Sequence, residues 1–440
     1  MSLITQTFPV IEALVARHAE DAAFYWSQLD GAIRSPTLRL DRLHHFNGLL
    51  DAHLDGLLVA GSQGWQPAMD ALTRWKKPGE AFVCTWLAAQ GDGRQRLDEV
   101  LEVAKVSPQN VLRGMISALA WLPPGCAAPV IGQWGHAAMV PVAQVAALRA
   151  AALIGPEAVA ALGSPLADFL VCADSHVRAA ACRALAGGHH GAAVAALRDA
   201  LADADVTVRA EAAIALGKGQ DAARALPVLQ RCVIDQAHTC AAATGWHRMQ
   251  AVRRLDRWVR ELAWLTPFGM AGTGAMLATL PPRTALTFVL AHGDPSHLGF
   301  VARLAGEPEV SRYAGWVWQS LTGIDLAETG LALPEPPPSA LARDELITEA
   351  RLDADNGLPQ PDSAALCAHP ASESPVASHA GPVLLGRSLD RQHALDLLQG
   401  GPQALRLLAA RTLGVTVRGP VHPQLAALGR MQAESAEGNR

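Results

Sequence analysis

The stretch "DSHVRAAACRALAG" (174–187) is repeated in altered form as "DVTVRAEAAIALGK" (205–218). The two copies begin 31 residues apart, and each has an Asp, then a Val-Arg pair, then Ala and Leu. Within the first copy, Val177, Ala181 and Leu185 recur at the spacing of one helix face. Each copy therefore predicts a buried helix, and the alanines allow a neighbouring helix to approach closely.

The same frame recurs closer to the N-terminus of the chain. Val145 and Leu153 keep the spacing with Ala146 in place of the Arg, and Val111 and Leu119 lie one step further back. A helix–turn–helix unit with this period is typical of a solenoid. The Asp, Val-Arg and Ala-Ala-Leu signature resembles HEAT repeats of the short kind found in phycobilisome-lyase proteins. We predict an all-α, right-handed superhelical solenoid of HEAT-like helix pairs, with an N-terminal helical region and a C-terminal helical cap.

The polar residues of the two copies, Asp174 with Arg178 and Asp205 with Arg209, are predicted to be structural. An Asp at a helix start accepts backbone N–H bonds. An Arg one turn later is placed to contact the Asp of the next repeat, so that the four residues form a ladder along the stack.

The composition changes on either side of the repeats and divides the chain. Segments such as "LPEPPPSALARDE" are rich in Pro, Ser and Ala and lack periodicity, which predicts an exposed, irregular connector. The apolar "PVLLG" and "LDLLQ" favour C-terminal helices that fold back onto the stack. The predicted parts are an N-terminal helical region (1–75), the solenoid (76–323, clearest at 165–230), the connector (324–382), a C-terminal helix pair (383–430) and a disordered tail (431–440).

Charge and hydropathy exclude several classes of partner. A net charge of −5 provides no electrostatic footprint for nucleic acid or an anionic membrane. No stretch approaches about 18 uninterrupted apolar residues, so no transmembrane helix is predicted. The seven cysteines are scattered without a CxxC, and the N-terminus lacks a signal-peptide pattern. We therefore expect reduced thiols and a cytoplasmic location.

The segments outside the repeats carry a second resemblance that spans nearly the whole chain. "HAEDAAFYW", "AHLDGLLVAG", "YAGWVWQSLTGID", "ADNGLPQPD" and "GPVLLGRSLDRQHALDLLQGGPQALRLLAA" occur in the order expected for a family of uncharacterised proteobacterial proteins. Genes of that family are often found among type VI secretion loci. The resemblance implies a context and transfers no site. The chain departs from the family pattern at Thr37, where a His is expected after Pro36.

Motifs that would indicate chemistry are missing from the sequence. It has no His-Glu dipeptide of the kind used by iron hydroxylases built from similar repeats, no GxSxG and no phosphate-loop pattern. Two groups of ligand-type residues lack recognised metal spacing: His292, Asp294 and His297 in "HGDPSH", and Cys232, His238 and Cys240 in "CVIDQAHTC". We predict no catalytic residue, metal or cofactor.

Five residues are candidates for binding a protein partner. Trp65 and Trp134 lie among turn residues, where a Trp is available as an exposed anchor. Arg253, Arg257 and Arg260 form a basic stripe on one helix face, suited to an acidic partner.

The sequence favours a non-catalytic protein-binding scaffold or adaptor, and the second resemblance implies an effector or spike component of type VI secretion as its partner. An immunity protein against a neighbouring toxin, and an enzyme whose site forms only in three dimensions, remain open as alternatives. The oligomeric state is not predicted.

Overall fold

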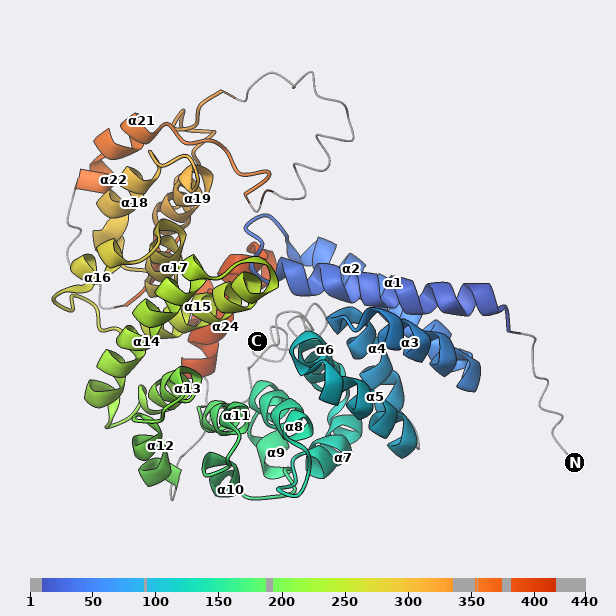
Figure 1. Cartoon of the computed structure of the whole chain (residues 1–440). Coiled ribbons are helices and arrows are strands. Elements are labelled where there is room, and N and C mark those ends of the chain that lie inside the picture. Colours follow the sequence, from blue (N-terminus) through green and yellow to red (C-terminus); the bar gives the residue numbers. More distant parts are fainter. Residues whose placement is uncertain are drawn as a thin grey trace, which may run out of the picture. The chain divides into compact units, whose positions relative to one another are not determined.

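The predicted all-α fold is confirmed. The computed structural model describes residues 10–90, 93–186, 193–334, 353, 355–373 and 381–416, and these are helical except for loops and one two-stranded sheet (Figure 1). They form two compact units, which are described separately. Unit one lies within Met1–Ala200 and Gln399–Ala410, and unit two within Leu201–Leu398 and Arg411–Thr416. The right-handed superhelix and the five-part division of the chain stay predictions.

Unit one is a stack of helix pairs in two layers. Its elements are α1 (Glu12–Gly31), η1 (Ala32–Arg34), α2 (Leu40–Val59), α3 (Ser62–Trp75), α4 (Pro78–Ala89), α5 (Arg94–Val106), α6 (Pro108–Trp121), α7 (Pro124–Trp134), α8 (Pro141–Ile154), α9 (Pro156–Ala160), α10 (Leu166–Leu170), α11 (Ser175–Leu185) and α12 (Val194–Ala200). Helices α4, α6, α8 and α11 pack in sequence to form one layer. Helices α3, α5, α7, α9 and α10 pack against them from the other layer. This alternation is the helix-pair arrangement that the repeats predict.

Small residues set the close packing within unit one. A Cβ atom at Gly114 in α6 would lie 1.9 Å from the carbonyl oxygen of Pro78 in α4, so only glycine fits there. Two polar contacts join α1 to α6: Trp26 Nε1 donates to Ser117 Oγ at 2.9 Å, and Arg113 Nε donates to Asp30 at 2.7 and 2.8 Å. Close packing and satisfied polar groups thus hold the first helix on the stack.

The two quoted repeats fold as α11 in unit one and α13 in unit two. Asp174 accepts hydrogen bonds from the N–H groups of His176 and Val177, and Asp205 does the same one repeat later. The predicted helix caps are therefore confirmed. The apolar face is confirmed as well, because Val177 and Val208 are fully buried.

Unit two has the same two-layer pattern and contains one short β-hairpin. Its elements are α13 (Val206–Leu216), α14 (Ala222–Ala242), α15 (Gly245–Leu265), α16 (Thr273–Thr279), α17 (Pro282–His292), η3 (Pro295–His297), α18 (Leu298–Leu304), α19 (Ser311–Thr322), α21 (Ser363–Ala368), α22 (Pro370–Glu373), β1 (Val383–Leu384) and β2 (Arg387–Ser388). Helices α13, α15, α17 and α19 pack consecutively, with α14, α16 and α18 against them. The antiparallel hairpin aligns Val383 with Ser388 and Leu384 with Arg387.

Part of the predicted irregular connector is folded, which corrects the sequence expectation. Helices α21 and α22 pack on α18, and Leu366 of α21 is fully buried. Backbone bonds join Leu333 N–H to Gln360 O and Asp362 N–H to Leu331 O, both at 2.8 Å. Residues 335–352, 354 and 374–380 of the connector lie outside the described residues.

The predicted C-terminal helix pair is present as α23 (Arg391–Gly400) and α24 (Gln403–Thr416), which have residues in both units. Within unit one, Gln403 N–H donates to Leu38 O at 2.7 Å and Ala404 N–H donates to Ser35 O at 3.1 Å. These bonds satisfy N–H groups in the first turn of α24, which have no partner inside the helix. Residues 417–430 of the predicted pair and the predicted tail (431–440) lie outside the described residues.

Candidate protein-interaction surface

The two tryptophans proposed as exposed anchors are both buried. Trp65 is 7% exposed and Trp134 is fully buried. Glycines near Trp65 indicate a turn in the sequence, but the helix begins before it, at Ser62, and Trp134 is the last residue of α7. Trp65 Nε1 donates to Glu99 Oε2 at 3.0 Å, which joins α3 to α5. The prediction that these rings face solvent is wrong, because both belong to helices that bury them.

Most of the predicted basic stripe on α15 forms ion pairs inside unit two. Arg257 forms an ion pair with Glu211 of α13 at 2.7 Å, and Trp258 Nε1 donates to the same carboxylate oxygen at 3.3 Å. Arg260 pairs with Asp256 at 3.0 Å, and burial lowers the pKa of Arg260 to about 10. These contacts fix α15 on its neighbours. Arg257 and Arg260 are therefore better assigned to structure than to a partner.

The exposed part of α15 lies closer to its N-terminus. Met249 is 56% exposed and Val252 is 45% exposed, three residues apart on one side of the helix. Arg253 is exposed beside them, and Trp246 is half-buried one turn before Met249. We call these four residues the α15 surface. Arg253 is thus the one residue of the predicted stripe that belongs to an exposed apolar and basic surface.

The sequence contains a signal for this surface, which can be recognised once the buried side of α15 is known. The buried side of α15 follows Ala251, Leu255 and Trp258 at helical spacing. Met249 and Val252 are apolar but out of phase with that series. Neighbouring apolar residues on the solvent side of a helix are a feature of interaction sites.

The four ladder residues have local structural roles. Arg178 Nη1 donates to the carbonyl oxygens of Cys172 and Ala173, and Arg209 Nη1 donates to those of Asp203 and Ala204. These carbonyls belong to the loop before each helix, so each Arg closes the turn of its own repeat. The contact from one repeat to the Asp of the next stays a prediction.

Ligand-type side chains come together at one place among the described residues. His292, Asp294 and His297 bring one ligand atom each to within 4.8 Å of one another. Cys232, His238 and Cys240 are described residues that do not form such a group, and burial raises the pKa of the Cys232 and Cys240 thiols.

Within the described part of the chain, every helix is too short or too polar to span a lipid bilayer.

Comparisons with known proteins give one family match. A family profile described as HEAT repeats matches residues 163–245, from just before α10 to the first residue of α15. Among solved structures, the crystal structure of an engineered protein is 14% identical and covers 97% of this chain and 94% of its own, with a TM-score of 0.24. At that score the likeness carries no argument. No curated protein matches the chain.

Proposed function

We propose that this chain is a non-catalytic scaffold or adaptor that binds a protein partner. The observation that carries the proposal is the α15 surface, which begins directly after the segment that matches HEAT repeats. Stacked helix pairs present extended surfaces, and proteins built from them commonly use those surfaces to hold other proteins.

The chemistry of the α15 surface supports a partner of a particular kind. Met249 and Val252 supply exposed apolar area, and Arg253 places a charge beside it. Interfaces of this kind combine an apolar centre with a polar rim and prefer a partner of opposite charge at the rim. We propose a partner with an apolar patch bordered by acidic side chains. Because the whole chain carries a net charge of −5, the attraction is local and does not come from a long-range field.

The resemblance to proteins encoded among type VI secretion genes supports a narrower form of the proposal. We propose that the partner is an effector or spike component of such a system and that the adaptor acts in the cytoplasm. The sequence motifs carry the resemblance and gene context supplies the secretion role, so experiment must supply the identity of the partner.

The test is capture of the tagged chain from its native host, with crosslinking and mass spectrometry. A variant with Met249→Asp and Val252→Asp removes the apolar part of the α15 surface at exposed positions. The matched control carries Val59→Asp and Val106→Asp, which are 90% and 72% exposed and lie in unit one. We expect one partner in near-equal amount with the wild-type chain and the control, and its loss with the α15 variant.

Two other outcomes would count against the proposal. Recovery of no stoichiometric protein partner from the native host contradicts the scaffold function. If the captured protein is a toxin and the chain protects cells from it, the function is immunity, and the adaptor proposal is wrong.

A further inference from the structure

His292, Asp294 and His297 lie within six residues, where α17 ends and the 3-10 turn η3 follows. His292 is the last residue of the helix, and Gly293 leaves it with a φ of +73°. A Cβ atom at Gly293 would lie 2.7 Å from Cβ of Pro382, so glycine is also needed here to leave room for Pro382, the residue before the hairpin. Asp294 then caps the 3-10 turn η3 by accepting the Ser296 N–H at 2.9 Å.

The contacts of His292 fix its tautomer. Its Nδ1 lies 3.0 Å from the carbonyl oxygen of Ala263, which only accepts hydrogen bonds, so Nδ1 carries the proton. In the neutral ring, Nε2 then carries a lone pair that is available to accept a hydrogen bond or bind a metal ion. A histidine whose second nitrogen donates to a backbone carbonyl has the arrangement typical of a metal ligand.

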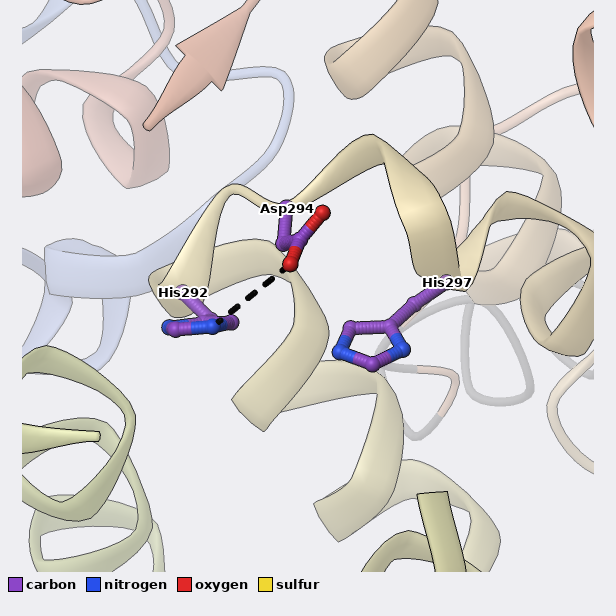
Figure 2. A group of neighbouring side chains, drawn as sticks. All are labelled: His292, Asp294 and His297. Atoms are coloured by element: carbon purple, nitrogen blue, oxygen red, sulfur yellow. Dashed lines mark ion pairs between the residues drawn. The ribbon is translucent and has the colours of Figure 1, made fainter. Parts of the chain in front are cut away.

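The lone pair of His292 faces a second electron-pair donor. Its Nε2 is 4.0 Å from Oδ2 of Asp294, and Oδ1 of the same carboxylate is the atom that caps η3. Figure 2 shows the carboxylate between the two imidazole rings, with the His297 ring directed towards the other two side chains. Two acceptors that face each other in a buried place favour a cation between them.

The surroundings of His292 are buried and apolar. His292 is 3% exposed, and the ring of Phe268 stacks on it with centroids 4.5 Å apart. Burial lowers the pKa of His292 and of His297.

We propose that His292, Asp294 and His297 bind a single divalent transition-metal ion, with Zn²⁺ as the expected occupant. Two imidazole nitrogens and one carboxylate oxygen suit zinc, which commonly takes three protein ligands and one further position. Ligand atoms around tetrahedral zinc lie about 3.3 Å apart, closer than the 4.8 Å spread seen here. Binding therefore requires the three ligand atoms to draw closer, including Nε2 of His292 and Oδ2 of Asp294, which lie 4.0 Å apart. This proposal differs from the sequence expectation that the chain binds no metal.

The ion would crosslink neighbouring elements at one end of unit two. Its ligands join the end of α17 to η3 and the start of α18, and Val383 N–H of the hairpin donates to Gly293 O at 2.8 Å beside them. Metal binding to the folded state raises its stability by mass action. This proposal does not depend on the protein-binding function, because its readouts are metal content and melting temperature.

The experiment titrates Zn²⁺ into the purified, chelator-treated full chain by calorimetry, with Co²⁺ absorption to report the ligands. We expect one ion per chain and a rise in Tm. Asp294→Asn keeps the helix-capping oxygen and His297→Gln keeps a polar group, so both variants should fold. Each should weaken binding at least about tenfold, since ligands matter no less than the residues that orient them.

Two controls separate this site from adventitious binding. His238→Asn removes an exposed histidine of α14, and Cys367→Ser removes an exposed thiol. Both should bind Zn²⁺ like the wild-type chain. If the wild-type chain takes up no Zn²⁺, or if Asp294→Asn and His297→Gln bind it as tightly as the wild type, the proposal is wrong.

Discussion

Helix α13 and the segment 355–373 are both parts of unit two, but different forces hold them. In α13, Val208, Ala212 and Leu216 are buried at helical spacing, and the stabilisation comes from apolar packing. Segment 355–373 buries few apolar side chains and depends on polar contacts with distant residues.

Three such contacts attach the segment. Arg283 donates to both oxygens of Asp355 at 2.6 and 2.8 Å. Gln360 Nε2 donates to Ser311 Oγ at 2.7 Å, and Trp318 Nε1 donates to Ser372 Oγ at 2.9 Å. The comparison shows two sources of stability. Apolar residues at helical spacing stabilise α13 through packing, whereas residues elsewhere in the chain hold segment 355–373 in place. A destabilising substitution in α13 should therefore lower the stability of the whole chain, whereas one that affects segment 355–373 should loosen that segment alone.

The largest effect is expected from Val208→Asp in α13. The change buries an unpaired carboxylate among apolar side chains, which should cost about 4 kcal/mol or more of unfolding free energy. Urea unfolding of the whole chain measures it. Thr207→Asp is the matched control, because the neighbouring site is only half-buried and a carboxylate in the first turn of a helix is favourable. Equal losses in the two variants would contradict the assignment of Val208 to the apolar face.

A smaller and local effect is expected from Arg283→Ala. Asp355 is 6% exposed and would lose its charged partner, which should destabilise the attachment of segment 355–373 by about 2 kcal/mol. Arg283→Lys should be intermediate, because lysine keeps the charge but loses the paired geometry. Hydrogen exchange across residues 355–373 and across α13 provides the measurement. Faster exchange in α13 as well as in the segment would show that the two regions are not independent.

Loss of the helix caps should cost less and should affect both repeats alike. Asp174→Ala and Asp205→Ala each remove hydrogen bonds to two backbone N–H groups, and each should cost about 1 kcal/mol. Asp→Asn at the same positions keeps the capping oxygen and should cost less. Thermal or urea unfolding distinguishes the variants. An Asn substitution as costly as Ala would mean that the negative charge, and not the cap, is what the repeats need.

The smallest expected effect is a pH dependence of the attachment of segment 355–373. Burial raises the pKa of Asp353, but the hydrogen bond and charge of Arg312 outweigh it, so the pKa lies below its ordinary value. A carboxyl with a lowered pKa stabilises the fold above its unfolded pKa, and this contribution is lost as pH falls through the folded value. Pepsin cleavage within residues 355–373 should therefore rise as pH is lowered from about 5 to about 2.

Arg312→Gln is the matched variant for this pH effect. Without the guanidinium the pKa of Asp353 returns upward, so the rise in cleavage should begin at a higher pH than in the wild type. The same onset in both proteins would contradict the role of this ion pair.

The same contrast explains what the sequence can predict. The face of α11 and α13 and their Asp caps are local patterns, so one sequence is enough to infer them. The pairing of Arg283 with Asp355 joins residues 72 positions apart and leaves no local pattern, which is why the connector looks irregular. Trp65 and Trp134 mislead because turn residues nearby also begin or end helices. The group of His292, Asp294 and His297 is visible in the sequence, but its metal-binding geometry depends on the carbonyl of Ala263.

The most direct test of the central claim, protein binding through α15, is hydrogen exchange of the chain with and without its captured partner. We expect protection to concentrate at residues 246–253, with segment 355–373 unchanged. The Met249→Asp and Val252→Asp variant should lose that protection, whereas the Val59→Asp and Val106→Asp control should keep it. Protection elsewhere with residues 246–253 unchanged would contradict the assignment of the binding surface to α15.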